Sequence, residues 1–282
     1  MRVPAINSAE VALEAKSPAA AAPLPIDVFG MAFENVTLAT AARNLVNDAR
    51  RGRRSRVVFV NAHVINEVAH DHVYLATVAT AEARYADGSG MAVAATLAGH
   101  RFIDNVNGTD LFPVLCGEAA RAGVGIFLLG AKPGVAEEAA ANIAKSGHGR
   151  AITGTHHGFF ASGSQDEADV IAAINASGAG IVLVAMGVPL QDQWIERNRS
   201  RLTAPVLAGV GGLFDFASGR MSRAPNAFRA VGCEWVWRLA MEPRRMWQRY
   251  LIGNAVFMGH AVVSAWRDAH DQRRLQSQTA RG

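Results

Sequence analysis

Residues 123–134 have the sequence GVGIFLLGAKPG, and this stretch indicates the fold most clearly. Its apolar first part, 123–130, predicts a buried strand. Ala131-Lys132-Pro133-Gly134 then predicts a tight turn into a helix over 135–145. Strand, short glycine turn and helix in this order form one βα unit, from which parallel sheets are built.

The same unit recurs on both sides of this stretch. Upstream, residues 56–60 predict a buried strand that ends at Asn61, with a helix after it. Residues 83–87 lead through Gly88-Ser89-Gly90 into an alanine-rich helix at 91–98. Further strands are expected at 150–154, 180–186 and 205–210, and further helices from 109, at 165–176 and at 190–200. About five such units predict an α/β fold, a Rossmann-like, mainly parallel sheet flanked by helices.

The pattern changes after Arg220, where sheet-like runs stop. Residues 226–240 and 243–267 have the spacing of amphipathic helices that break at Pro243. We therefore expect four parts: a disordered N-terminal arm 1–25, an α/β domain 26–219, a helical appendage 220–270 and a flexible tail 271–282.

The composition favours a cytoplasmic protein. The chain has 282 residues, of which 50% are hydrophobic and 18% charged, which is enough to bury a sizeable core. Its 2 cysteines cannot form a disulfide framework and lack metal-binding spacing. The N-terminus does not resemble a signal peptide, and the most apolar stretch, 251–266, is too short to span a bilayer.

Positive charge is concentrated at the C-terminal end. Residues 220–282 carry a net charge of +7, so the other residues carry −3 of the formal total of +4. Four tryptophans lie among these arginines, at Trp235, Trp237, Trp247 and Trp266. The pattern is equally typical of a segment that docks on an anionic membrane or a phosphate and of a solvated helix surface. An apolar, arginine-bearing appendage is also a surface through which the chain could form a homo-oligomer.

In a parallel sheet, ligands bind beyond the carboxyl ends of the strands. Asp87 lies at such an end, beside glycines that permit a sharp turn, and a carboxylate there can accept a proton from an attacking hydroxyl. The alternative is that Asp87 only caps the following helix. Asp215, after the last strand, is a rival acidic catalyst.

Other strand ends offer weaker signals. The turn from Gly130 to Gly134 could hold a diphosphate through backbone amides, or be a plain turn. Gln191, after Gly187-Val188-Pro189, could hydrogen-bond a uracil or a sugar, or be first-turn helix polarity. Arg223 could neutralise a phosphate, or be a surface residue. His156-His157 matches no metal-site pattern, so no metal or other cofactor is expected.

Two other function classes remain open on these signals. A nucleotide-cofactor oxidoreductase would use a similar sheet, but G-x-G-x-x-G with a following acidic residue is absent. The basic end also suits a non-enzymatic module that binds an anionic ligand. No recognition helix or stacking-sheet motif for nucleic acid is present in the sequence.

Taken together and in order, the motifs resemble the bacterial WecG/TagA/CpsF glycosyltransferase family, or glycosyltransferase family 26. The resemblance covers about residues 27–260. Its main matching stretches are Val60-Asn61-Ala62, Ala86-Asp87-Gly88-Ser89-Gly90, Asn107-Gly108-Thr109-Asp110-Leu111, Gly154-Thr155-His156-His157-Gly158, Gly187-Val188-Pro189-Leu190-Gln191, Gly211-Gly212-Leu213-Phe214-Asp215, Arg223-Ala224-Pro225 and Gly232-Cys233-Glu234-Trp235.

The resemblance implies an inverting, metal-independent transferase that moves a sugar from a UDP-sugar to a polyprenyl-diphosphate-linked saccharide. Such enzymes act at the cytoplasmic membrane face in cell-surface or exopolysaccharide synthesis. It implies that Asp87 is the base, that Asn61 and Gln191 line the sugar pocket, and that arginines of the appendage, such as Arg223, approach the active site and help membrane docking.

Two departures from the family pattern concern the presumed sugar and phosphate pocket. Phe59 stands where many members have threonine. Asn105-Val106-Asn107-Gly108 stands where many have Arg-x-x-Gly. With Asn105 in place of the arginine, the chain is more similar to exopolysaccharide members of the xanthan or acetan type that transfer glucose than to those that transfer N-acetylmannosamine.

Overall fold

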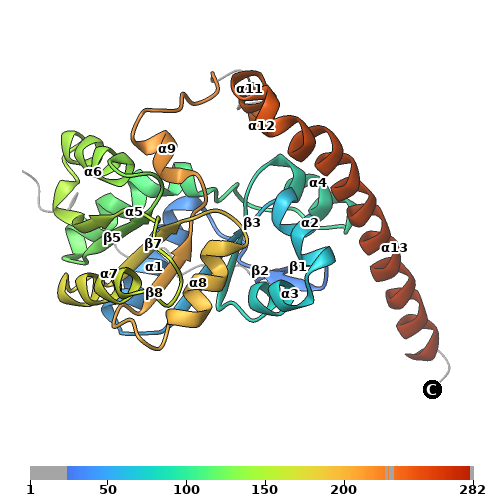
Figure 1. Ribbon diagram of the computed structural model, residues 1–282. Helices are drawn as coiled ribbons and strands as arrows, with labels where there is room; N and C mark the ends of the chain where they lie inside the picture. The colour runs from blue at the N-terminus through green and yellow to red at the C-terminus, as the bar shows by residue number, and fades with distance from the viewer. Residues whose placement is uncertain (1–23, 226–227, 229–231, 280–282) are drawn as a thin grey trace, which may run out of the picture.

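The computed structural model describes residues 24–225, 228 and 232–279. Its centre is a sheet of six parallel strands in the order β4-β3-β8-β7-β5-β6 (Figure 1). These strands are β3 (Ser55–Val60), β4 (Ala83–Ala86), β5 (Ile126–Gly130), β6 (Ile152–His156), β7 (Ile181–Ala185) and β8 (Val206–Gly209). The predicted α/β fold with a mainly parallel, helix-flanked sheet is confirmed.

The four inner strands are buried along their whole length because helices cover both faces of the sheet. Every residue of β3, β5, β7 and β8 is buried. Alternation along β3 sends Val57 and Phe59 to one hydrophobic cluster and Val58 and Val60 to another. Such two-sided burial is typical of parallel sheets built from βα units.

One face of the sheet is covered by α1 (Leu38–Arg50), α5 (Gly108–Ala122) and α6 (Val135–Lys145). Helix α1 begins because Thr37 accepts a hydrogen bond from the backbone amide of Thr40. Its apolar stripe buries Leu45 at 1% exposure. Burial of one such leucine contributes about 1.5–3 kcal/mol, so the stripe holds the helix against the sheet.

The opposite face has two coverings. Helices α7 (Gln165–Ala176) and α8 (Leu190–Asn198) pack on β5, β7 and β8. Over β3 and β4 lie α2 (Ala62–His70), α3 (His72–Ala79), α4 (Ser89–Leu97) and a two-stranded hairpin of β1 (Ile26–Val28) and β2 (Met31–Phe33). A short 3₁₀ turn, η1 (Gly149–Ala151), precedes β6.

The C-terminal helices form an arc over the domain. After α9 (Leu213–Ala217) come α11 (Glu234–Met241), α12 (Pro243–Trp247), the π-helical turn η2 (Gln248–Ile252) and α13 (Gly253–Thr279). Figure 1 shows α11 and α12 above the main body and α13 descending beside α2 and α4. Phe257 of α13 is 1% exposed, so this helix shares the core of the domain.

Hydrogen bonds reinforce this docking. The Asn66 side chain donates to the Gly253 carbonyl at 2.8 Å, and the Ser89 hydroxyl donates to the Gly232 carbonyl at 2.8 Å. The break at Pro243 occurs as predicted. No helix among the described residues is both long and apolar enough to cross a bilayer.

The domain boundaries drawn from sequence remain predictions. Most of the arm 1–25 lies outside the described residues, as do 226–227, 229–231 and 280–282. The predicted helix over 226–240 is described as a helix from Glu234. Helix α13 continues to Thr279, so the boundary placed at residue 270 falls inside a helix.

Candidate active site

Asp87 and Asn61 meet at the carboxyl ends of two neighbouring strands. Val60 of β3 pairs with Ala86 of β4, so the two residues that follow stand side by side. The Asn61 amide nitrogen donates to the Asp87 carboxylate at 3.1 Å. The Asn61 side-chain oxygen Oδ1 accepts from the backbone amides of His63 and Val64 at 3.1 and 3.2 Å. Because capping α2 occupies that oxygen, the amide nitrogen must face Asp87.

Asp87 does not cap the following helix. The N-cap of α4 is Gly88, with φ 90°, and no side chain makes a capping hydrogen bond there. The Gly88 amide instead donates to the side-chain oxygen of Asn105 at 2.8 Å. The structural alternative for Asp87 is therefore wrong, and Asn105 fixes the turn that presents the carboxylate.

The environment raises the pKa of Asp87 above its usual value. Partial burial is the main cause, and the charge of Glu234 adds to it. The hydrogen bond from Asn61 and the charges of Arg249 and Arg238 act in the opposite direction. Glu234, Arg238 and Arg249 all belong to the appendage, so the C-terminal helices contribute to the electrostatics of this carboxylate.

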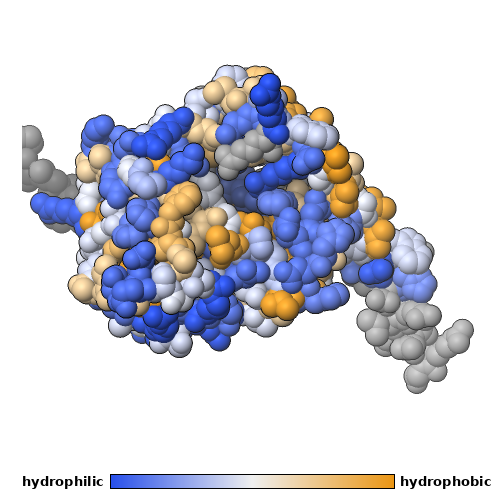
Figure 2. All heavy atoms as spheres, in the orientation of Figure 1, coloured by the Kyte–Doolittle hydropathy of each residue, from blue (hydrophilic) through white to orange (hydrophobic). Residues whose placement is uncertain are grey.

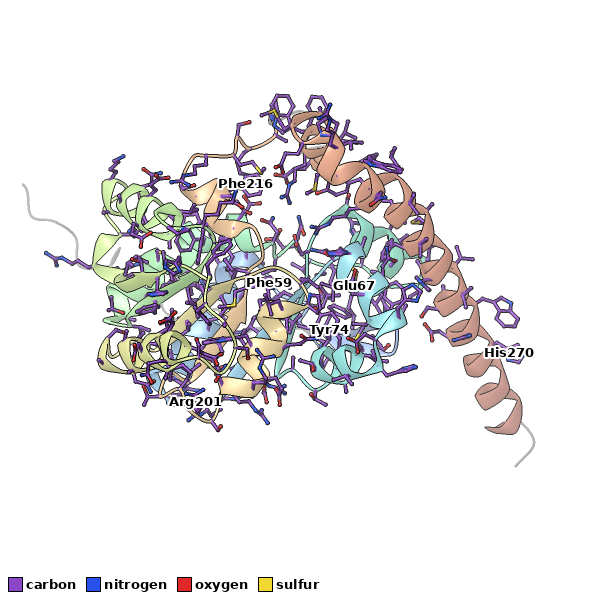
Figure 3. The ribbon with its side chains drawn as sticks, in the orientation of Figure 1. Phe59, Glu67, Tyr74, Arg201, Phe216 and His270 are labelled. Carbon is purple, nitrogen blue, oxygen red and sulfur yellow. The ribbon has the colours of Figure 1, made fainter. Side chains whose placement is uncertain are left out.

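Arg238 and Arg249 were not among the site residues predicted individually from sequence. The guanidinium of Arg238 lies 5.0 Å from the ring centroid of Phe216, a residue at the end of the main body that faces the appendage (Figure 3). Burial, together with the charge of Arg249, lowers the pKa of His63 to about 4, so His63 is neutral at physiological pH. The arginine-rich composition of the C-terminal end indicates that arginines approach the site, but composition alone does not identify Arg238 and Arg249 among them.

Arg223, which the sequence predicts as a phosphate-binding residue, lies between two carboxylates. It donates to Asp110 at 2.6 Å and approaches Glu234 at 3.4 Å. Asn107 is 8% exposed and caps α5, because its oxygen accepts from the Asp110 amide at 2.9 Å. Arg223 thus joins α5 to the appendage, whereas Asn107 fixes the start of α5. A contact of Arg223 with a substrate phosphate, and of Asn107 with a sugar, remains a prediction.

The sense in which the chain moves from strand to strand across the sheet changes between the parallel neighbours β5 and β7. From β5 the chain moves outward to β6, whereas from β7 it moves inward to β8. Such a switch point opens a crevice for nucleotides in α/β sheets. A side chain at Gly130, with φ 131°, would collide with the Ala185 carbonyl. Gly187, with φ 81°, begins the facing turn, which contains the cis peptide bond Val188–Pro189.

The remaining predicted residues lie around the same end of the sheet. Gln191 is 3% exposed, and its side-chain oxygen accepts from the Gly211 amide at 2.8 Å. It therefore ties α8 to the turn after β8, and contact with a sugar remains a prediction. Asp215 lies in α9, beyond that turn, and within the part of the chain that the structure describes it forms no hydrogen bond with Asn61 or Asp87.

The histidine pair is engaged locally. The His156 ring nitrogen Nδ1 lies 2.7 Å from the His157 carbonyl, and the two rings are 4.4 Å apart. Within the described part of the chain, no group of three or more His, Cys, Asp or Glu side chains is placed to hold a metal ion.

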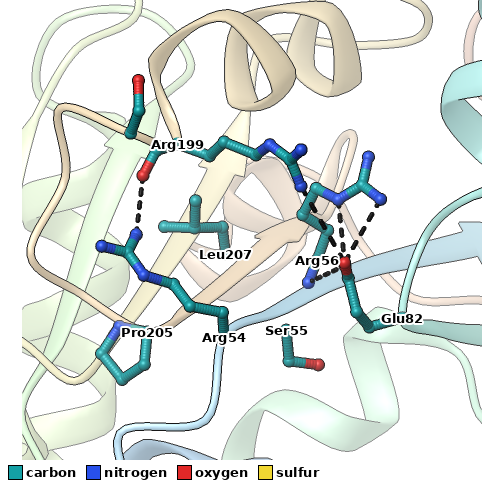
Figure 4. Close-up of a pocket in the computed structure, with 8 residues that line it drawn as sticks. Arg54, Ser55, Arg56, Glu82, Arg199, Pro205 and Leu207 are labelled. Carbon is teal, nitrogen blue, oxygen red and sulfur yellow. Dashed lines mark hydrogen bonds and ion pairs between the residues drawn. The ribbon is translucent and has the colours of Figure 1, made fainter.

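A second charged cavity lies at the opposite, amino end of the strands. It has a volume of about 220 Å³ and is lined by Arg54, Arg56, Glu82 and Arg199 (Figure 4). Arg56 is paired with Glu82 at 2.9 Å and with Glu196. Arg54 donates to the carbonyls of Arg199 and Leu202. Protein groups thus engage the cations of this cavity, whereas the Asp87 end has a carboxylate held by a neutral amide.

The sequence model of the glycosyl transferase WecG/TagA/CpsF family matches residues 26–271. The chain belongs to this family. It is therefore a glycosyltransferase of cell-surface polysaccharide synthesis, and family membership implies, in general terms, a sugar-nucleotide donor and a lipid-linked acceptor. Membership decides against the oxidoreductase and the non-enzymatic module that charge and fold left open.

The two departures from the WecG/TagA/CpsF pattern have different structural consequences. Phe59 is 7% exposed and stacks on Tyr85, with ring centroids 5.8 Å apart. It packs in the core beneath the site. Asn105 is exposed and contacts the turn after Asp87, so this departure lies at the site itself.

Proposed function

We propose that this chain is an inverting glycosyltransferase that moves glucose from UDP-glucose to a polyprenyl-diphosphate-linked saccharide, in exopolysaccharide synthesis. The observation that carries the proposed reaction is the Asn61–Asp87 pair, and glucose is proposed because Asn105 stands beside this pair where many members have arginine. Asp87 is partly buried, its pKa is raised, and it accepts a hydrogen bond from an amide whose orientation is fixed. A general base works best when its pKa is moved toward the working pH.

In the proposed reaction, an acceptor hydroxyl attacks the anomeric carbon on the face opposite UDP. The new bond joins the acceptor oxygen to that carbon while the bond from the carbon to the UDP oxygen breaks. Asp87 takes the proton of the attacking hydroxyl, and UDP leaves with the electron pair of the broken bond. Holding the hydroxyl and the donor in line contributes by proximity as well as by proton transfer.

The leaving diphosphate needs positive groups, and we propose that the protein supplies them without a metal ion. The crevice between β5 and β7, with its backbone amides at Gly130 and Gly187, receives the nucleoside end of UDP, and the diphosphate extends from it toward Asp87. Arg238 and Arg249 of the appendage are close enough to influence Asp87 electrostatically. Fixed dipoles and cations at a developing negative charge are a major source of catalysis.

We further propose that the appendage docks on the anionic inner face of the cytoplasmic membrane. Large apolar side chains are exposed along it, among them Trp247 at 44%, Leu251 at 55% and Trp266 at 68%. Figure 2 shows hydrophobic surface down the side where α13 lies. Apolar side chains interleaved with arginines suit the boundary between headgroups and acyl chains.

The decisive experiment is a donor screen with the full chain. UDP-glucose, UDP-N-acetylmannosamine and its uronic acid are each supplied with farnesyl-diphosphate-linked sugars, and the products are identified by mass spectrometry. Transfer from UDP-glucose in excess EDTA, with inverted anomeric configuration by NMR, is the expected result. Transfer only from the mannosamine donors would contradict the glucose assignment, and loss of activity restored by Mg²⁺ would contradict the metal-free mechanism.

Docking is tested by sedimentation with vesicles of phosphatidylglycerol and phosphatidylcholine. Leu251→Ser combined with Trp266→Ser is expected to reduce co-sedimentation, because both side chains are exposed on the appendage. Val73→Ser, at an apolar residue of α3 that is even more exposed (73%), is the control. Equal sedimentation of all three proteins would contradict docking through this surface.

A further inference from the structure

A groove lies beyond the edge strand β4, between α4 and the segment 99–107. Its volume is about 610 Å³, which falls in the range of roughly 300–1,000 Å³ usual for small-molecule sites. Ala86 and Gly88 line it. These two residues flank Asp87 in the chain, so the groove runs beside the turn that carries the proposed base.

The outer wall of the groove is held in place by hydrogen bonds. The Asn35 side chain accepts from the Ile103 amide at 2.7 Å and donates to the Arg101 carbonyl at 3.4 Å. Asp104 accepts from the Leu38 amide at 3.1 Å. Asn105 ties the end of the wall to Gly88. A wall that is ordered before a ligand arrives reduces the entropic cost of binding.

The lining combines polar and apolar groups. Ala92 and Thr96 stand one turn apart on α4, and Ile103 of the opposite wall is 53% exposed. The guanidinium of Arg101 has no ion-pair partner among the described residues. Sugars present hydroxyls at their edges and apolar C–H faces, so they suit a lining of this kind, and a cation adds affinity for an attached phosphate.

The groove also lies on the correct side of Asp87 for an acceptor. The switch-point crevice is between β7 and β5, and β4 is three strand spacings, about 14 Å, from β7. Asp87 therefore stands between the donor crevice and the groove. In an inverting displacement the attacking hydroxyl approaches from the side opposite the leaving group, which here is the side of the groove.

We propose that this groove is the acceptor subsite, which takes the sugar-1-diphosphate end of the lipid-linked saccharide. The ring packs between Ile103 and the Ala92 face of α4, the diphosphate contacts Arg101, and the attacking hydroxyl points toward Asp87. This inference rests on the proposed function and assigns a place to one of its two substrates.

The test is direct binding to the full chain in the presence of UDP. The probes are farnesyl-diphosphate-linked glucose and the corresponding glucosyl-glucose, measured by isothermal titration calorimetry. Ala92→Trp fills the groove and is expected to weaken binding of the probes at least tenfold while UDP affinity stays unchanged. Ala172→Trp, at an exposed alanine of α7, is the matched control and is expected to bind as the wild type does.

Arg101→Gln separates the two halves of the ligand and does not depend on the fold tolerating a tryptophan. It is expected to weaken the diphosphate-linked probes about tenfold, because it removes a charge-assisted contact, and to leave methyl glucoside binding unchanged. Equal losses for both ligands would overturn the role given to Arg101.

Binding and transfer are read separately, so the two proposals can fail independently. If the wild type binds a probe, and Ala92→Trp does not, the groove assignment holds even when no transfer follows, in which case the proposed reaction fails. Full binding by Ala92→Trp, or no binding of either probe by the wild type, would overturn the acceptor subsite.

Discussion

The two ends of the central sheet handle charge in opposite ways. At the amino end, Arg56 neutralises Glu82 and Glu196. Burial would raise the pKa of Glu82, but the hydrogen bonds and charge of Arg56 lower it below its usual value. At the carboxyl end, Asp87 is held by the neutral amide of Asn61, and its pKa is raised. A carboxylate becomes a useful base where no cation neutralises it directly.

Asp192, deeper in the protein, is also a carboxylate held by a neutral donor, as Asp87 is. It is 3% exposed and accepts a hydrogen bond from the Tyr74 hydroxyl at 2.7 Å. Its other oxygen is buried and has no hydrogen-bond partner in the described part of the chain. Burial raises the pKa of Asp192 to about 6 despite the bond from Tyr74. Neutral partners at this end of the sheet therefore leave more than one carboxylate uncompensated.

The largest expected effect comes from removing the base. Asp87→Asn should lower the rate of sugar transfer by about 10²–10⁴-fold, because no carboxylate remains to accept the proton of the attacking hydroxyl. The fold and the affinity for UDP should persist. Initial rates and calorimetric titration with UDP measure the two properties. Asp215→Asn, at the rival acid, is the control and should retain most activity. A reversal of these two outcomes would transfer the role to Asp215.

At the amino end of the sheet, a substitution that removes a charged side chain should lower stability and leave catalysis unchanged. Arg56→Met removes the partner of two carboxylates and should lower the free energy of unfolding by about 1–3 kcal/mol, since both carboxylates remain partly hydrated. Activity per folded molecule should not change. Urea unfolding measures the loss. Arg53→Met, in an exposed pair with Asp48 at 3.7 Å, should cost under about 1 kcal/mol.

The pH dependence of unfolding tests whether Asp192 is uncompensated. Its pKa is about 6 in the folded protein and 3.8 ordinarily, so the folded state retains a proton that the unfolded chain releases. Stability should fall as pH rises from about 4 to about 6, and Asp192→Asn should lack this fall. The advantage of the variant should grow by up to about 3 kcal/mol across that window. A difference independent of pH would contradict the raised pKa.

The smallest expected effect is a pair of opposite shifts in the pH profile. Arg249 lowers and Glu234 raises the pKa of Asp87. Arg249→Gln should therefore move the acid limb of kcat/KM to higher pH, and Glu234→Gln should move it to lower pH, each by less than about one unit. Shifts in the same direction would show that the appendage does not act on Asp87 through charge.

Much of the fold could be predicted because its signal is local. Apolar runs located the four inner strands β3, β5, β7 and β8 to within a few residues, since a strand covered on both faces is buried throughout. The hairpin of β1 and β2 and helix α3 were not predicted. Each strand of the hairpin is only three residues long, and α3 lacks an apolar stripe on one side.

The sequence by itself determined the family, the sheet and the position of Asp87 at a strand end, because those depend on residue order and local apolar pattern. Only the tertiary structure decided the partners of Asp87. Asn61 reaches it because β3 and β4 are neighbours in register, and Arg238, Arg249 and Glu234 approach it because α13 packs on α2 and α4. Such long-range pairings depend on how elements distant in the chain pack together, which no local pattern encodes.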